Sequence, residues 1–279
     1  MDLNSLRAAS APKLDHLRSL LASTGGTLVA FSGGVDSTFV LAVAREVLGE
    51  RAIALTAHSP SVPASEREEA RELARLLGAR HVEVESREGE DPRYAANPVD
   101  RCYYCKTELY RLCTDTAREL GLPAIVDGFN ADDRKDHRPG HQAALERGVR
   151  SPLAEAGLGK LDVRAWSEAY RLPTWDKPQM ACLASRLPYG VAVTPERLAQ
   201  VERAEHAVRG LGFRNFRVRW HEAIGRVEVA EDEIDAAFRR RADVVAAVKS
   251  AGFKLAVLDL EPFRSGRLNE LAGVRLPVL

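Results

Sequence analysis

Short apolar runs alternate with longer amphipathic segments through the first two thirds of the chain. The predicted strands cover residues 27–31, 52–57, 81–84 and 124–128. The predicted helices between them cover residues 38–48, 65–77 and 101–120. Strands that are buried on both faces and separated by helices predict an α/β fold with a doubly wound parallel sheet. Nucleotides bind such sheets at the carboxyl ends of the strands.

The pattern changes after about residue 190. Thr194 and Pro195 have the character of an N-cap and a first helical residue, and they predict a helix that ends near Arg209. The predicted elements that follow are strands at 216–221 and 226–229, a helix at 231–249 and a strand at 254–260. We therefore predict two domains, residues 1–190 and residues 191–279, of which the second is a small α+β domain.

Composition and charge exclude several classes of protein. The 279 residues suffice for two domains with cores of their own. Lys plus Arg and Asp plus Glu both number 40, so the formal net charge is zero and we expect no nucleic-acid partner. No apolar run approaches the roughly 20 residues that span a bilayer. The first residues predict an amphipathic helix and no signal peptide, so we expect a cytoplasmic protein without membrane contact.

A glycine-rich segment, FSGGVDSTFV at residues 31–40, joins the first predicted strand to the first predicted helix. It lacks the lysine with which Walker-type loops hold β- and γ-phosphates, so backbone N–H groups at a helix N-terminus would hold the anion. This arrangement suits pyrophosphate as a leaving group of ATP, with Asp36 as a ligand of Mg²⁺. The predicted ATP-binding residues here are Ser32, Gly33, Gly34, Val35, Asp36, Ser37 and Thr38. The string SGGVDS resembles the PP-loop signature of N-type ATP pyrophosphatases, and the structural alternative is a capped strand–helix turn.

Two further segments fit a nucleotide site. Ala57, His58 and Ser59 end the second predicted strand, where PP-loop proteins hold adenine with backbone groups. The segment DGFNADD, residues 127–133, resembles the GTNADD segment of ammonia- and glutamine-using synthetases. Gly128 and Asn130 would approach the nucleotide there, and Asp132 or Asp133 would face metal or substrate. A turn with solvated acidic side chains is the alternative.

Four cysteines in a chain of this size do not form a disulfide framework. Cys102 and Cys105 share a helix face, but iron–sulfur and zinc sites normally take four ligands. Cys182 is the candidate third thiol, and Cys113 is expected in the core. Three thiolates would leave one iron of a four-iron cluster open to an extra sulfide. The alternative is that these cysteines are small hydrophobic residues on buried faces.

The segment CLASR places a thiol, a hydroxyl and a guanidinium within five residues. An arginine near a thiol lowers the pKa of the thiol and favours the nucleophilic thiolate. We therefore predict Cys182, Ser185 and Arg186 as catalytic residues, together with Asp36.

SGGVDS, RCYYCK, DGFNADD with the following DHRPG, KPQMACLASR and FRVRWH together resemble the LarE family of ATP-dependent sulfurtransferases. The resemblance extends from about residue 28 to residue 260. It implies a PP-loop, adenine nucleotide alpha-hydrolase-like fold, and sulfuration of pyridinium-3,5-dicarboxylate mononucleotide in the biosynthesis of a nickel-pincer cofactor. It also implies a homo-oligomer, namely a ring-like hexamer, and transient contact with other proteins of cofactor biosynthesis is a further expectation.

The same resemblance implies that Cys182 handles the sulfur. Because the chain also has Cys102 and Cys105, it is similar to a three-cysteine branch that carries a [4Fe-4S] cluster. Two sulfur sources stay open: a cluster-bound sulfide, or the sulfur of Cys182 itself, which would leave dehydroalanine. A carboxylate is a poor electrophile, so in either case adenylation would first supply AMP as a leaving group.

A phosphorylated substrate needs a binding site of its own. Arg217 and Arg219 alternate in the predicted strand FRVRWH, so their side chains project to one face. Arginine pairs bind phosphate in bidentate geometry, and a solvated strand face is the alternative. The predicted ligands of a divalent cation near that phosphate are Glu205, Glu228 and Asp235. We therefore expect residues 191–279 to bind the substrate phosphate and to take part in oligomerisation.

Two other functions share these features. A PP-loop tRNA thiolase or an amide-forming synthetase would also adenylate its substrate, but the zero net charge disfavours a tRNA partner. A nucleotide-sensing α/β protein would bind ATP and leave it intact, and it would need neither the thiol of Cys182 nor the arginine pair.

Overall fold

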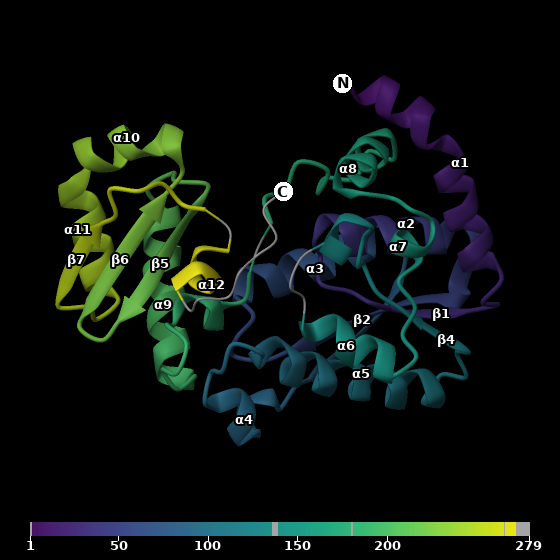
Figure 1. Cartoon of the computed structure of the whole chain (residues 1–279), viewed down its shortest axis with the longest axis horizontal. Helices are drawn as coiled ribbons and strands as arrows, with labels where there is room; N and C mark the ends of the chain where they lie inside the picture. The colour runs from purple at the N-terminus through teal and green to yellow at the C-terminus, as the bar shows by residue number, and fades with distance from the viewer. Residues whose placement is uncertain (1, 136–138, 180, 265, 272–279) are drawn as a thin grey trace.

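The computed structural model describes residues 2–135, 139–179, 181–264 and 266–271. Residues 136–138, which belong to the DHRPG segment quoted above, lie outside the described residues. Figure 1 shows two sheets with their helices, one formed by the first part of the chain and the other, drawn in green and yellow, by the last part. None of the helices in the described ranges combines the length and apolarity that a bilayer crossing requires.

The first sheet has four parallel strands in the order β3-β2-β1-β4. Its strands are β1 Thr27–Ala30, β2 Ala52–His58, β3 Arg80–Glu85 and β4 Ala124–Val126. A single parallel bridge between Val126 and Arg150 continues the sheet beyond β4. The α/β fold with a doubly wound parallel sheet, as predicted from the apolar runs, is confirmed.

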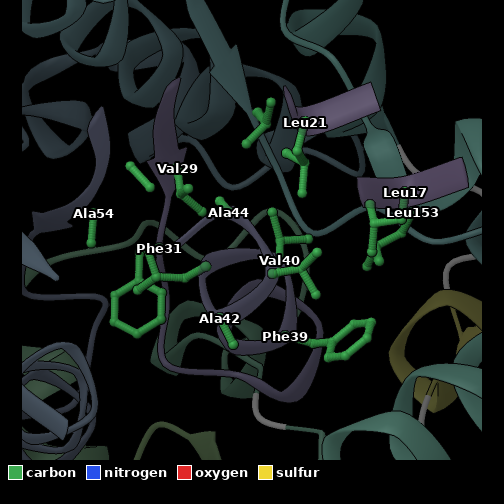
Figure 2. Packing of buried hydrophobic residues seen from close by; sticks show 14 of the residues in the cluster. Leu17, Leu21, Val29, Phe31, Phe39, Val40, Ala42, Ala44, Ala54 and Leu153 are labelled. Atoms are coloured by element: carbon green, nitrogen blue, oxygen red, sulfur yellow. The ribbon is translucent and has the colours of Figure 1, made fainter. Parts of the chain in front are cut away.

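Helices cover both faces of this sheet (Figure 1). They are α1 Leu3–Ala22, α2 Val35–Leu48, α3 Ala64–Leu76, α4 Pro92–Ala95, α5 Arg101–Glu119, α6 Pro139–Glu146, α7 Pro152–Glu155 and α8 Lys160–Ala169. Successive residues of β1 point to opposite faces. Val29 belongs to a buried cluster with residues of α1 and α2, and Figure 2 shows it beside Ala44 of α2. Leu28 instead joins the cluster that contains Cys113 of α5, so the sheet is buried on both sides.

The second sheet has three strands in the order β5-β6-β7. Its strands are β5 Phe216–His221, β6 Ile224–Val229 and β7 Leu255–Leu258. β5 and β6 are antiparallel, whereas β6 and β7 are parallel. The helices of this part are α9 Pro195–Arg209, α10 Ile234–Arg239, α11 Arg241–Ser250 and α12 Arg267–Leu271. The side chain of Thr194 accepts a hydrogen bond from the backbone of Arg197, as the predicted N-cap requires.

The predicted helix at 231–249 is interrupted in the structure. A 3-10 turn, Glu231–Glu233, comes before α10, and the chain changes direction at Arg240, which has φ −97° and ψ 24°. The change of direction lets each short helix bury its own small apolar face, with Ala237 on α10 and Val248 on α11. Helical periodicity alone does not reveal such a break, because both halves keep helical spacing.

The hydrophobic core of the second sheet extends into the segment before residue 190. Leu183, Ala184 and Leu187 belong to the same buried cluster as Phe216 and Val227. Tyr94, which follows the first sheet's β3, also belongs to it. The segment around Cys182 is therefore packed between the two sheets, and a domain boundary near residue 190 stays a prediction.

Gly225 in β6 gives a test of this packing. A Cβ at Gly225 would lie 2.5 Å from Val248 Cγ1 and 3.1 Å from Phe253 Cδ2, so Gly225→Ala must displace α11 or the turn after it. We expect a loss of about 1–3 kcal/mol in the free energy of unfolding, the usual cost of overpacking. Urea denaturation followed by circular dichroism measures it. Gly89→Ala is the matched control, since nothing lies within 4 Å of a Cβ there. Equal stability of the two variants would contradict the described contact of β6 with α11.

Candidate active site

The diphosphate loop, residues 31–38, joins β1 to α2. Gly34 is the N-cap of α2, and its N–H donates to Ser32 Oγ over 3.4 Å. The hydroxyl oxygens of Ser32 and Ser37 lie 3.1 Å apart. Gly33 has a φ of +71°, a conformation that glycine adopts without strain. The loop thus forms the helix N-terminus that the sequence predicted, with the N–H groups of an anion-binding turn.

Asp36 is a half-buried carboxyl in the first turn of α2. Burial, together with the nearby negative charge of Asp133, raises the pKa of Asp36 to about 6. The nearby side chain of Asn130 and the charges of Lys160 and Arg164 act in the opposite direction. A divalent cation would favour the ionised form further, because it adds positive charge beside the carboxylate.

The end of β4 lies against this helix N-terminus. A Cβ at Gly128 would lie 2.8 Å from Ser37 N, so only glycine allows the close approach. Asn130 is fully buried, and its Oδ1 accepts hydrogen bonds from the backbones of Asp132 and Asp133. The segment predicted to approach the nucleotide therefore meets the diphosphate loop at the carboxyl edge of the sheet.

The segment predicted to hold adenine forms the carboxyl end of β2, where Ala57 and His58 are half-buried. His58 Nε2 contacts Glu83 Oε2, and the Ser59 hydroxyl donates to Glu88 Oε1 over 2.6 Å. Because the side chains of His58 and Ser59 already bind other side chains of the protein, adenine would contact the backbone of this segment.

The thiol loop, residues 175–186, carries Cys182 as the N-cap of the 3-10 turn Leu183–Arg186. Leu183 N–H donates to Ser61 O over 2.9 Å, which fixes the loop to the segment after β2. Cys182 and Cys105 both pack at the edge of the core of the second sheet. The structure thus brings the predicted sulfur-handling residue to the space between the two sheets.

Arg186 has a different position from the one that the sequence suggested. Its guanidinium is fully buried, and Nε and Nη2 each donate to a carboxylate oxygen of Glu205 over 2.8 Å. Nη1 donates to the carbonyl oxygens of Ala181 and Cys182 and to Ser185 Oγ, over 2.5, 3.0 and 3.1 Å. Arg186 therefore shapes the backbone of the thiol loop.

The arginine that reaches the sulfur is Arg101, which the sequence analysis did not select. Its Nη2 lies 4.0 Å from Cys182 Sγ, and its Nη1 donates to Ala184 O over 3.0 Å. Arg101 is buried in the first turn of α5, next to Cys102. The position of Arg101 directly before the CYYC segment could have marked it as a candidate. Its contact with residues 182–184, however, depends on tertiary structure and is not visible in the sequence.

Cys102 and Cys105 lie in the first turns of α5, and Cys113 is buried in the core as expected. Burial, with the charge of Glu88 as a second cause, raises the pKa of the Cys105 thiol well above its usual range. The side chain of Cys102 reaches the surface, yet partial burial of its sulfur and the nearby Cys182 raise the pKa of Cys102 too. Cys102 and Cys105 share α5, and Cys182 acts electrostatically on both of them.

The thiols do not form a site for a single metal ion. Within the described ranges, no three His, Cys, Asp or Glu side chains are arranged to hold one ion. A four-iron cluster spreads its thiolate ligands over separate corners, so it needs neighbouring thiols that do not converge on one point. Cys102, Cys105 and Cys182 are thiols of the type that such a cluster takes, and cluster binding by these residues stays a prediction.

The two arginines of β5 are both buried, at 4% and 7% exposure for Arg217 and Arg219. Arg219 is paired with Glu228 over 2.9 Å, whereas Arg217 donates to the carbonyl oxygens of Phe216 and Gln179. Burial and the charge of Arg186 lower the pKa of Arg217 to about 10. The hydrogen bonds described for Arg217 go to neutral oxygens, its guanidinium lies 4.5 Å from the centre of the Phe263 ring, and the negative charge of Glu205 acts on it. Phosphate binding by Arg217 stays a prediction.

The three predicted ligands of a divalent cation have different surroundings in the structure. Glu205 is paired with Arg186, and Glu228 with Arg219 and Arg226. Asp235 is exposed in the first turn of α10. Arginine charges therefore already balance the two buried acids, and metal binding by these three residues stays a prediction.

Three cations near the diphosphate loop were not selected from the sequence. Lys160 and Arg164 of α8 act electrostatically on Asp36. Lys177 of the thiol loop lies with Nζ 3.5 Å from Gly33 O. All three come from segments more than 120 residues after the loop, and no local pattern links them to it.

Comparison with known proteins shows which proteins this chain is similar to. The family model described as asparagine synthase matches residues 18–106, which include the diphosphate loop. A pyridinium-3,5-bisthiocarboxylic acid mononucleotide synthase of Lactiplantibacillus plantarum is 38% identical over 264 residues, which cover 94% of this chain and 96% of that protein. Uncharacterized proteins of Synechocystis and of Methanocaldococcus jannaschii are 44% and 24% identical, over 93% and 85% of this chain.

The match to the Lactiplantibacillus protein covers nearly the whole of both chains. The PP-loop at the carboxyl edge of a parallel sheet agrees with that likeness. The chain belongs to the LarE family of ATP-dependent sulfurtransferases.

Proposed function

We propose that this enzyme adenylates a carboxylate of pyridinium-3,5-dicarboxylate mononucleotide and replaces a carboxylate oxygen with sulfur, for the biosynthesis of a nickel-pincer cofactor. The observation that carries the proposal is the attachment of the thiol loop beside the nucleotide edge of the sheet, through the hydrogen bond from Leu183 N–H to Ser61 O. The printed name of the Lactiplantibacillus relative, a bisthiocarboxylic acid mononucleotide synthase, supports the same substrate class.

In this mechanism the diphosphate loop binds the β- and γ-phosphates of ATP through backbone N–H groups at the N-terminus of α2. Asp36 is the ligand of Mg²⁺, which neutralises charge on the phosphates when it is bound. The substrate carboxylate attacks the α-phosphorus, the bond to the bridging oxygen breaks, and pyrophosphate leaves. The acyl adenylate that remains has AMP as a leaving group, so a sulfur nucleophile can attack the acyl carbon.

Arg217 and Arg219 would hold the substrate phosphate. Arg217 is the stronger candidate, because its buried guanidinium makes its described hydrogen bonds to carbonyl oxygens only. A phosphate there would pair with the guanidinium in bidentate geometry. Arg219, which already pairs with Glu228, would orient that site.

Cys182 would handle the sulfur, with Arg101 beside its sulfur atom and with Ser185 and Arg186 holding the loop in shape. Cys102, Cys105 and Cys182 are the residues that would hold a [4Fe-4S] cluster, whose open iron would supply an extra sulfide. The alternative source is the thiol sulfur of Cys182 itself. A homo-oligomer, a cytoplasmic location and contacts with other biosynthetic proteins remain expectations that the described geometry does not address.

The ionisation of Asp36 predicts a pH dependence of Mg²⁺·pyrophosphate binding. Since the pKa of Asp36 is about 6, protons compete with Mg²⁺ below that pH, and affinity should fall about tenfold per pH unit there and level off above pH 7. Asp36→Asn should bind weakly at every pH and lose this dependence. Calorimetric titration between pH 5 and 8 measures both.

The stability of Asp36→Asn serves as the control. The folded protein holds the Asp36 proton between pH 3.8 and about 6, so the raised pKa costs stability as pH rises through that window. The variant should therefore melt no lower than the wild type at pH 8. An unchanged pH profile of binding in Asp36→Asn would contradict the assigned role.

Replacement of Cys182 separates adenylation from sulfur transfer. With ATP and the dicarboxylated substrate, Cys182→Ala should form AMP and pyrophosphate but transfer no detectable sulfur. Cys113→Ala, which removes a thiol from the core, should retain transfer. Chromatography of the nucleotides and mass spectrometry of the substrate measure the two steps. Release of ADP by the wild type would reject the proposed reaction, and sulfur transfer by Cys182→Ala would reject the role of that thiol.

Arg217→Met should weaken binding of the phosphorylated substrate, with a rise in KM of about tenfold or more, because a charge-assisted hydrogen bond is lost. The KM for the dephosphorylated nucleoside should change little. Arg239→Ala, at an exposed position of α10, is the control. Steady-state rates of AMP formation test this, and an equal rise in KM for both substrates would argue against a phosphate contact.

A further inference from the structure

Lys177 occupies an unusual place between the two loops of the site. Its ammonium group is mostly buried, with 15% of the side chain exposed, and it pairs with Glu66 over 2.8 Å and Glu69 over 2.6 Å. Its third contact is the carbonyl oxygen of Gly33, 3.5 Å away, in the diphosphate loop. Lys177 belongs to the thiol loop, five residues before Cys182. One side chain thus joins α3, the diphosphate loop and the thiol loop.

Arg164 of α8 strengthens this connection. Its guanidinium donates to Trp175 O over 2.8 Å and to Lys177 O over 2.7 Å, so it fixes the backbone at the start of the thiol loop. The same charge acts on Asp36. The far end of the loop is held by the hydrogen bond from Leu183 N–H to Ser61 O. Between these two ends, Gln179 O accepts from Arg217, and Cys182 O accepts from Arg186.

The direction of the Lys177 contact distinguishes it from a Walker lysine. A Walker lysine reaches the phosphates themselves, whereas Lys177 contacts a carbonyl oxygen of the loop. The Lys177 ammonium group lies 3.5 Å from the carbonyl oxygen of the peptide between Gly33 and Gly34, in the turn on which the nucleotide would bind. A ligand on the diphosphate loop would therefore bind next to the Lys177 contact.

We propose that Lys177 is a positioning residue that couples occupation of the diphosphate loop to the placement of Cys182. This inference rests on the proposed function for the chemistry that follows, but not for the coupling itself. With nucleotide bound, the Lys177 contact would hold the thiol loop in one arrangement. The sulfur nucleophile would then attack the acyl adenylate faster than water hydrolyses it. Without the contact, adenylation would continue, but the thiol loop would no longer be held in a fixed position relative to the diphosphate loop.

The coupling is measurable without the substrate. Peptide-resolved mass spectrometry gives the rate at which iodoacetamide alkylates Cys182, with and without Mg²⁺ and a non-hydrolysable ATP analogue. In the wild type we expect the nucleotide to slow alkylation about fivefold or more, within the usual range of coupling between sites. In Lys177→Met the rate should be the same with and without nucleotide, and Lys177→Arg should restore most of the effect. Lys254→Met, at an exposed position before β7, should behave as the wild type.

A double variant checks that the contact network is responsible. Glu66→Gln with Glu69→Gln removes both partners of Lys177, and it should abolish the nucleotide effect as Lys177→Met does. Because the three residues act together, the triple variant should show no further loss. If Lys177→Met proves unstable in thermal melting, the Glu66→Gln, Glu69→Gln double variant tests the same coupling. It keeps the lysine and removes only its two carboxylate partners.

Product analysis then links the coupling to the reaction. With the dicarboxylated substrate, Lys177→Met should transfer about fivefold less sulfur per AMP formed, whereas the KM for ATP changes little. An equal loss of AMP formation and sulfur transfer in Lys177→Met would overturn the inference. So would a wild-type rate of Cys182 alkylation that is the same with and without nucleotide. Failure of the wild type to form AMP would instead reject the proposed function, while the alkylation result would still stand.

Discussion

The buried ion pair between Arg186 and Glu205 is the interaction on which the arrangement of the site depends. Arg186 is fully buried, and its donors serve Glu205 of α9 and the carbonyl oxygens of Ala181 and Cys182 at the same time. Loss of one partner from such a pair typically costs about 3–5 kcal/mol, because an unpaired charge stays buried. Glu205 also accepts from the backbone of Val218 in β5. One carboxylate therefore joins the thiol loop to the second sheet.

This constraint explains why two structural units are needed for one reaction. The parallel sheet carries the diphosphate loop at its carboxyl edge, and the second sheet carries the buried Arg217. The thiol loop is held from both sides, through Leu183 N–H on Ser61 and through Arg186 on Glu205. In the proposed function, the first of these sites would bind the phosphates of ATP and the second would bind the phosphate of the substrate.

Much of this could be predicted from the sequence, for reasons that differ between residues. Strand and helix periodicity predicted the parallel sheet, because its central strands β1 and β2 are apolar on both faces. The diphosphate loop was predictable since all of its residues are contiguous and glycine is required at Gly33. Arg101 and Lys177 were missed because each acts across more than 80 residues of sequence. The pairing of Glu205 with Arg186 was not foreseen either, since two charges on separate elements carry no local pattern.

The most direct measurement is a crystal structure with Mg²⁺ and a non-hydrolysable ATP analogue. The expected result is that the β- and γ-phosphates contact backbone N–H groups of residues 32–38, with Mg²⁺ on Asp36 and with the α-phosphate on the side of the thiol loop that carries Cys182. A triphosphate bound elsewhere, or a thiol loop detached from Ser61 and Glu205 in the complex, would contradict the proposed alignment of adenylation with sulfur transfer.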